Sequence, residues 1–355
     1  MPRRQTHIDA AKVLASHLIV LHHFSVYGPL AEALVAVAPR LTEWFFDYAR
    51  IAVQVFLVIG GYLAAGTLAP QGYFRHLRPW RSIAQRYLRL ALPFSVALLL
   101  VVACSALAGQ WLQDDFIPPP PSLVALLVHF SLLFDILDYA SLSVGLWYVA
   151  IDFQLFALLA ILLWIGGSAA LCLVGLFILA SLLFFNLHES VDSWALYFFG
   201  SYGMGAFAWW VGNSRYAGRW LALMVVVGAA ALAWDFRLRI GLALLVAIGL
   251  GIVRCRLAAT AHQTQAAAPR LSETTSLLRV FSRSSYALFL THFCTVLLGN
   301  VLWLHLGWTF SGAAAWFAAG AWLVCVAVAL VFERFVERPL SVLRVPGWVV
   351  SHGVV

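Results

Sequence analysis

Charged residues are scarce in this chain of 355 residues. Only 10% of the residues are charged and 63% are hydrophobic, whereas soluble domains carry about 25% charged residues. The composition excludes an ordinary soluble domain and indicates an integral membrane protein. Alternation of apolar and polar residues at a period of two is also missing, which excludes a membrane β-barrel.

Cysteines are few and follow no pattern. The chain has five, an odd number without CxxC spacing, which implies neither a disulfide framework nor a zinc site. We therefore expect no metal and no tightly bound cofactor. The net charge of +7 comes from basic residues clustered between apolar runs. This distribution indicates the membrane topology rather than a binding partner. We expect no nucleic-acid partner.

Long apolar runs dominate what is present, and they predict an all-α, polytopic transmembrane helical bundle in a single domain, 1–355. We interpret the first run as a retained helix, because polar residues interrupt what would be the apolar region of a signal peptide. The ten expected spans are Ala10–Tyr27, Ile51–Ala69, Leu88–Gly109, Leu146–Ile165, Ala169–Asn186, Trp194–Val211, Trp220–Trp234, Ile240–Val253, Tyr286–Leu304 and Ala313–Phe332.

The basic residues also predict the topology. If the short apolar stretch 123–137 is re-entrant or interfacial, 18 of the 22 basic residues lie on one side, and the positive-inside rule makes that side cytoplasmic. Both termini are then cytoplasmic and residues 110–145 form an outer loop. Residues 257–278, rich in Ala, Gln, Thr and Ser, are expected to form a flexible cytoplasmic linker.

The first expected helix carries a polar stripe. Lys12 is the only lysine of the chain, and an eleven-residue step along a helix returns to within roughly 20° of the same face. Asp9, Lys12, Ser16 and His23 therefore share one face, and ionisable residues at membrane depth indicate function. The alternative is a snorkelling Lys12 paired with Asp9, with the histidines satisfied by neighbouring helices.

Three further segments hold candidate residues. Five arginines fall between Arg75 and Arg89, an arrangement that suits a polyphosphate ligand but also follows from the positive-inside rule. Trp147, Tyr148 and Asp152 begin another helix, where the aromatic pair is typical of a membrane interface and the acid is costly unless it is used or paired. His292 lies on an otherwise apolar helix.

These segments together resemble acyltransferase family 3 of membrane-bound O-acyltransferases over nearly the whole chain. The motifs are Lys12 with His23, Phe56–Leu63, Arg86 with Arg89 and Pro93, Trp147–Gln154, Ser285–His292 and Glu337–Pro339. The sequence differs from the usual family pattern at four positions. Lys12 replaces Arg, Gln54 replaces an acid, Gly60 replaces Ser and Asp152 replaces Glu.

The resemblance implies transfer of an acyl group, often acetyl, from cytoplasmic acyl-CoA to a hydroxyl of an extracytoplasmic or lipid-linked carbohydrate. It also implies a location in the bacterial inner membrane, with the lipid bilayer, acyl-CoA and a polysaccharide or glycolipid acceptor as partners. The expected site residues are His23, Lys12, Asp9, Asp152 and His292 for catalysis, Arg81, Arg86 and Arg89 for acyl-CoA, and Trp147, Tyr148 and Gln54 on the acceptor side.

The roles within this site stay open at the level of the sequence. His23 is either the base that deprotonates the acceptor hydroxyl or a transient acyl carrier. Asp9 and Lys12 are either part of the chemistry or a buried pair that fixes the helix. The rival from another class is a secondary transporter or flippase that uses buried His and Asp residues, against which the sequence has no visible inverted repeat. The third hypothesis is a non-catalytic membrane scaffold.

Overall fold

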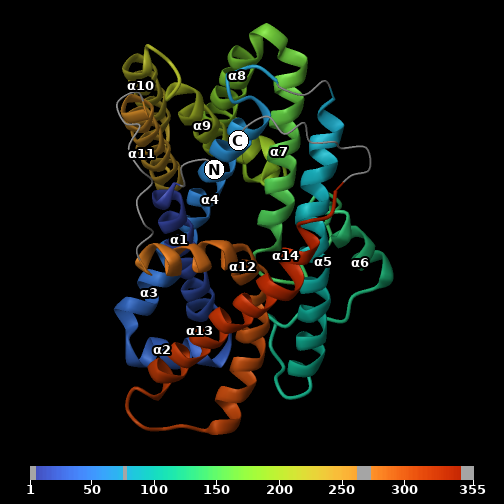
Figure 1. Cartoon of the computed structure of the whole chain (residues 1–355). Coiled ribbons are helices and arrows are strands. Elements are labelled where there is room, and N and C mark those ends of the chain that lie inside the picture. The colour runs from blue at the N-terminus through green and yellow to red at the C-terminus, as the bar shows by residue number, and fades with distance from the viewer. Residues whose placement is uncertain (1–4, 75–77, 262–272, 345–355) are drawn as a thin grey trace.

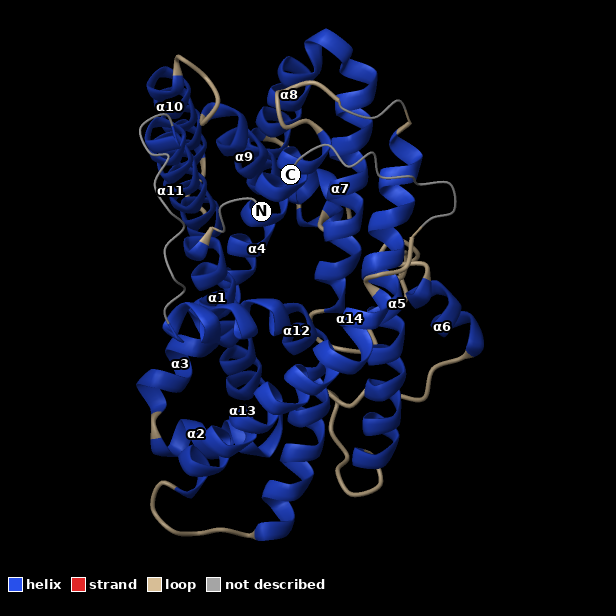
Figure 2. Ribbon diagram, in the orientation of Figure 1, coloured by secondary structure: helices blue, strands red, loops and turns tan. Residues whose placement is uncertain are grey.

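The computed structural model describes residues 5–74, 78–261 and 273–344, and these residues form helices and connecting loops without any strand (Figure 2). This confirms the expected all-α membrane fold. The helices are α1 (Thr6–Val26), α2 (Gly28–Val37), α3 (Pro39–Tyr48), α4 (Val53–Leu68), α5 (Pro79–Ala108), α6 (Leu123–Phe130), α7 (Leu146–Gly166), α8 (Ala170–Leu183), α9 (Ala195–Val211), α10 (Ala217–Trp234), α11 (Leu238–Ala261), α12 (Glu273–Leu306), α13 (Ala313–Phe332) and α14 (Arg338–Leu340). Short 3-10 turns are η1 (Ala49–Ala52), η2 (Gly167–Ala169), η3 (Phe185–Leu187) and η4 (Glu189–Val191), and the π-helical turn η5 (Glu333–Glu337) joins α13 to α14.

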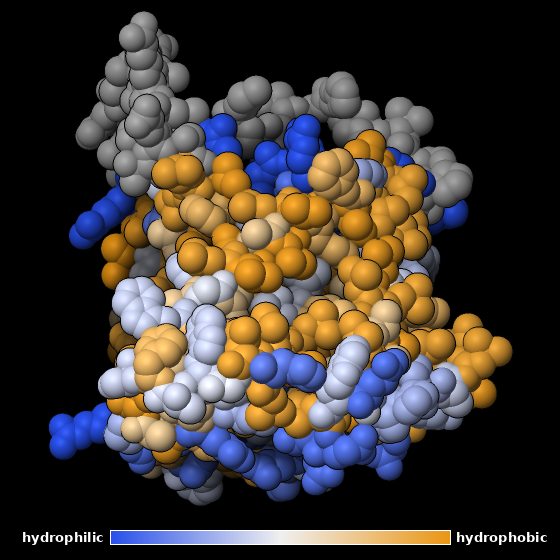
Figure 3. All heavy atoms as spheres, turned by 90° about the horizontal axis from the view of Figure 1, so that it is seen from below, coloured by the Kyte–Doolittle hydropathy of each residue, from blue (hydrophilic) through white to orange (hydrophobic). Residues whose placement is uncertain are grey.

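In the described part of the chain, seven helical segments are long and apolar enough to span a membrane, or eight if α1 and α2 count as one bent span. One of the seven, Leu146–Leu187, contains both α7 and α8, which pack against each other. Helix α9 has 17 residues. The count of ten spans and the cytoplasmic termini therefore remain predictions. Figure 3 shows hydrophobic residues across the middle of one face and hydrophilic residues along its lower and upper edges.

Two expected boundaries differ from the structure. Helix α5 begins at Pro79 rather than at Leu88, because a proline at the first helical position needs no N–H partner and the polar residues that follow are compatible with a helix outside the bilayer. Helices α11 and α12 cover both ends of the expected linker 257–278, and residues 262–272 lie outside the described residues.

The segment expected to lie outside the bilayer contains only a short helix. Helix α6 has eight residues, about 12 Å of helix, whereas a hydrocarbon core of about 30 Å needs about 20 residues. It lies beside α5 at the edge of the bundle (Figure 1), where Tyr87 Oη donates a hydrogen bond of 2.8 Å to the carbonyl of Phe130. Helix α6 is thus too short to span a membrane, as the sequence predicts for residues 123–137.

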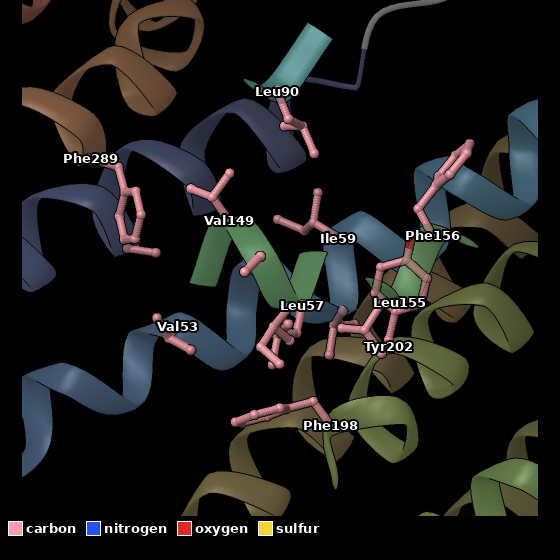
Figure 4. Close-up of a cluster of buried hydrophobic side chains, with 14 of the residues drawn as sticks. Val53, Leu57, Ile59, Leu90, Val149, Leu155, Phe156, Phe198, Tyr202 and Phe289 are labelled. Atoms are coloured by element: carbon pink, nitrogen blue, oxygen red, sulfur yellow. The ribbon is translucent and has the colours of Figure 1, made fainter. Parts of the chain in front are cut away.

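Close packing of α4 against α9 forms the centre of the bundle. A Cβ atom at Gly61 would overlap the carbonyl oxygen of Tyr202, and one at Gly205 would overlap that of Val58, so the two backbones touch where both residues are glycine. Small residues allow this approach between membrane helices. Apolar side chains of α4, α5, α7, α9 and α12 fill the surrounding core (Figure 4).

A sharp break separates α1 from α2, whose axes differ by 93°. Gly28 has φ +77°, a conformation that favours glycine, and Asn300 of α12 satisfies the backbone around it. Asn300 Oδ1 accepts from Leu30 N at 2.8 Å, and its Nδ2 donates to Tyr27 O at 3.1 Å and to Val296 O at 2.9 Å. The break places the C-terminal turn of α1 against α12.

Candidate active site

A cavity of about 410 Å³ lies where α1, η1, α7, α12 and the segment 110–145 meet. We call it the His23 cavity. Its lining includes His22, His23 and Tyr27 from the end of α1, together with Arg50 of η1 and Trp147 of α7. The remaining lining residues are mostly apolar, with two serines from the 110–145 segment, Ser141 and Ser143. A concave site with few polar groups is typical of ligand binding.

His23 and His292 form the central contact of this site. His292 Nε2 and His23 Nδ1 are 2.8 Å apart, and the rings lie with centroids 4.7 Å apart. His292 is fully buried on α12, and His23 is 8% exposed. The eleven-residue step from Lys12 thus leads to a histidine at a cavity wall, and the lone histidine of α12 lies against it.

The hydrogen bonds assign the tautomers of both rings. His292 Nδ1 lies 3.1 Å from the carbonyl oxygen of Leu288, and a carbonyl only accepts, so Nδ1 of His292 carries the proton. Nε2 of a neutral His292 must then accept, which makes Nδ1 of His23 the donor. The remaining ring nitrogen of His23, Nε2, therefore has a free lone pair and can act as a base.

Neighbouring aromatic rings hold His23 in this orientation. The Tyr27 ring, one helical turn further along α1, stacks on His23 with centroids 5.8 Å apart. The His22 ring lies 5.1 Å from that of His23, but its Nδ1 donates instead to the carbonyl of Phe45 at 3.0 Å. His22 is therefore bound to α3, and of these two adjacent histidines His23 is the one hydrogen-bonded to His292.

A second polar region surrounds Arg86, and we call the residues Arg86, Asp152, Lys12, Arg89 and Glu337 the Arg86 cluster. Arg86 Nη2 and Asp152 Oδ2 are 2.5 Å apart, and the side chains are 25% and 5% exposed. Lys12 interacts electrostatically with Asp9, Arg86, Arg89 and Asp152, and Arg89 with Glu337. The residues predicted for catalysis thus fall into two groups, with Asp152 beside Arg86 and His292 beside His23.

The stripe on α1 extends between the two regions. Asp9 Oδ1 accepts a hydrogen bond of 2.6 Å from Ser282 Oγ on α12, which fixes the first turns of α1 to α12. Lys12 has no ion pair with any residue that the structure describes. About 16 Å of helix separates Lys12 from His23, so the two do not act on the same atoms.

The three arginines expected to bind acyl-CoA differ in their surroundings. Arg86 is paired with Asp152, and its guanidinium also lies 5.4 Å from the Phe156 ring centre. Arg81 and Arg89 are exposed. Arg81 and Arg86 lie about 140° apart around α5. Arg86 thus faces the bundle, whereas Arg81 and Arg89 are open to solvent.

The three residues expected on the acceptor side also differ in their surroundings. Trp147 lines the His23 cavity and stacks on Phe198 at 5.6 Å. Tyr148 packs against Phe289 at 5.2 Å and does not line the cavity. Gln54 is 4% exposed and accepts a hydrogen bond of 2.7 Å from Ser201 Oγ, so it joins α4 to α9. Only Trp147 of these three contacts the cavity.

Sequence reasoning missed two cavity residues, Tyr27 and Arg50. Tyr27 is four residues after His23, a spacing that places both on one helix face, and this signal could have found it. Arg50 is one of only four basic residues predicted on the outer side, and its place directly before an apolar helix could have singled it out. No group of three metal-binding side chains occurs within residues 5–74, 78–261 and 273–344.

Comparison with protein families matches residues 6–332 to a family model described as an acyltransferase domain. The match covers α1 to α13 and so includes the lining of the His23 cavity and every residue of the Arg86 cluster except Glu337. Comparisons with curated proteins and with solved structures returned no match.

Proposed function

The chain belongs to this acyltransferase family, and on that premise we propose that it is an O-acyltransferase. It transfers an acyl group, acetyl in the expected case, from acyl-CoA to a hydroxyl of a carbohydrate that is extracytoplasmic or linked to a lipid. Its location is the bacterial inner membrane, with both termini cytoplasmic and residues 110–145 outside. The family supports the acyl transfer, and the arrangement of the two polar regions supports the assignment of substrates.

The observation that best supports this function is the His23–His292 pair at the wall of the His23 cavity. His23 Nε2 takes the proton of the acceptor hydroxyl while the hydroxyl oxygen attacks the thioester carbonyl carbon. The C–S bond then breaks, and the CoA thiolate takes the proton from His23. During the step His23 is an imidazolium whose Nδ1–H donates to His292 Nε2, which stabilises the charge.

The Arg86 cluster suits the donor end of the reaction. Acyl-CoA carries several phosphates, which arginine binds through paired N–H donors. The side chains of Arg81 and Arg89 are exposed in the N-terminal half of α5, and Lys12, which interacts electrostatically with Arg89, adds positive charge there. We propose that Arg81 and Arg89 bind the phosphates of acyl-CoA. Arg86 is held toward the bundle by its ion pair with Asp152.

The test is acyl transfer by purified protein in nanodiscs, supplied with labelled acetyl-CoA and a membrane glycolipid extract. His23→Ala should reduce transfer by about 10²- to 10⁴-fold, the usual contribution of a general base. His22→Ala, the matched control on the adjacent residue, should retain most of the activity. Equal losses in both variants, or near-normal transfer by His23→Ala, would contradict the assignment of the base.

The same assay without acceptor separates the two roles that the sequence left open for His23. A base leaves no label on the protein, whereas an acyl carrier retains labelled acetyl that is lost in His23→Ala. We expect no retained label. Movement of a labelled glycan across the membrane without release of free CoA would instead favour the transporter.

A further inference from the structure

We propose that Arg50 makes the His23 cavity selective for an anionic acceptor, a carbohydrate with a carboxylate or phosphate group near the hydroxyl that is acylated. This rests on the proposed function, because it assigns the charge of the acceptor in the same cavity. The sequence alone places Arg50 only among the outer basic residues.

First, Arg50 lies close to the proposed base. It lines the His23 cavity together with His22 and His23, and it interacts electrostatically with His22. Its charge is therefore on the wall of the same cavity as the proposed base, at a position where Arg50 is exposed. A ligand that reaches His23 from the cavity passes near this guanidinium.

The second step is the absence of a counter-charge. No aspartate or glutamate lines the His23 cavity, and among the described residues Arg50 has neither an ion pair nor a hydrogen bond. Asp114 lines a neighbouring cavity that shares Pro118, and its Oδ1 accepts from Phe116 N at 3.3 Å. The net charge on the cavity wall is thus positive, in contrast to Arg86, which has Asp152.

The third step is the chemistry of the surroundings. A guanidinium offers paired N–H donors that match the two oxygens of a carboxylate or phosphate. Ser141, Ser143 and Tyr27 supply hydroxyls on the same lining, and Trp147 supplies an apolar face. Such a combination suits a sugar ring that carries one oxyanion. A neutral sugar would leave the Arg50 charge without a partner.

The experiment measures binding and needs no turnover. The protein in nanodiscs is titrated by calorimetry with three probes that differ only at the sixth carbon, which are methyl glucoside, methyl glucuronide and methyl glucoside 6-phosphate. We expect the glucuronide or the phosphate to bind at least tenfold more tightly than the neutral glucoside. The stronger of the two identifies the group as a carboxylate or a phosphate.

The variant Arg50→Gln should weaken binding of the preferred anion by about ten- to a hundredfold, the usual range for a hydrogen-bonded charge. It should leave the neutral probe unchanged. Arg40→Gln is the matched control, since Arg40 is exposed on α3 and does not line the cavity. Arg50→Lys should restore part of the affinity, because it keeps the charge and loses the paired donors.

The outcomes separate this inference from the proposed function. Equal binding of the three probes, including no binding of any, overturns the selectivity, and so does an equal loss in the Arg50 and Arg40 variants. Acyl transfer to a glycolipid would stand in either case. If the anion binds through Arg50 but no acyl transfer occurs, the site is confirmed as an anion site and the proposed reaction is wrong.

Discussion

The His23 cavity and the Arg86 cluster differ in how their charges are compensated. In the cluster, Arg86 is matched by a buried carboxylate, Asp152, and Lys12 and Arg89 lie close by. In the cavity, two histidines share one hydrogen bond and Arg50 has no acidic neighbour on the lining. A buried ion pair holds helices together, whereas a free lone pair and an unmatched charge at a cavity wall can act on a ligand.

Two aromatic residues, Phe289 and Tyr148, connect the two regions. The ring of Phe289 on α12 lies 5.2 Å from the Tyr148 ring and 6.2 Å from the His292 ring, measured between ring centroids. Tyr148 interacts electrostatically with Asp152 and Arg86. Phe289 lines the cavity and Tyr148 interacts with the cluster, so this aromatic pair is in contact with both regions. Substitutions in the cluster should therefore change stability or donor affinity, whereas those in the cavity should change turnover or acceptor affinity.

The largest effect is expected for the buried ion pair. Asp152→Asn and Arg86→Gln should each lower the free energy of unfolding by about 3–5 kcal/mol, because each leaves one buried charge unmatched. The double variant Arg86→Met with Asp152→Leu should recover most of this loss, since neither charge remains. The measurement is thermal or denaturant unfolding in detergent.

The same variants test whether the Arg86–Asp152 pair is structural. If the single variants are as stable as the wild type while acyl transfer is lost, the pair acts on a substrate and is not a structural element. Recovery of activity as well as stability in the double variant would show that neither charge takes part in the reaction.

His292 is expected to have the next largest effect. His292→Ala removes the acceptor for His23 Nδ1–H and should lower the acyl-transfer rate by about 10- to 100-fold, the range for a hydrogen bond to a charged group. His292→Gln offers a side-chain oxygen and should restore part of the rate. His292 acts through His23, so in a His23→Ala background His292→Ala should cause no further loss. A further loss there would contradict this role.

Arg89 should differ from Arg86 in the property that its substitution changes. Arg89 is exposed and Arg86 is paired, so Arg89→Gln should raise the apparent KM for acyl-CoA by about tenfold, equivalent to about 1.4 kcal/mol, without loss of stability. The matched control is Arg215→Gln, which removes an exposed arginine from the α9–α10 connection. An unchanged affinity for acetyl-CoA, measured by calorimetry, would contradict the donor assignment.

The sequence predicts the fold class because membrane helices must satisfy their own backbone and therefore appear as apolar runs. It also predicts His23 on one face of α1, because helical periodicity is regular. Contacts between segments that are far apart in the chain are harder to predict from the sequence. The His23–His292 hydrogen bond joins residues 269 positions apart, and neither residue has a local pattern that names its partner.

The arginines near α5 show a second limit. Arg86 and Arg89 are three residues apart and look equivalent in sequence, yet only Arg86 has an ion pair among the described residues. That difference depends on where Asp152 of α7 packs, and the local sequence around α5 gives no information about this position. Gln54 shows the same limit, since its bond to Ser201 depends on the close packing of α4 with α9.

The smallest effect concerns the segment 110–145, which contributes Ser141 and Ser143 to the cavity lining. Asp135, in the same segment, belongs neither to that lining nor to the Arg86 cluster. Burial and the nearby Asp192 carboxylate raise the pKa of Asp135 from 3.8 to about 6. The folded protein thus binds more protons than the unfolded chain between these values, and stability falls as pH rises through this window.

Asp135→Asn should therefore stabilise the protein at pH 7.5, by at most about 1 kcal/mol because Asp135 is partly exposed, and the gain should vanish below about pH 4. Unfolding midpoints between pH 4 and 8 measure this, with exposed Asp115→Asn as the control. A gain that persists at low pH would show that the effect comes from packing and not from the charge.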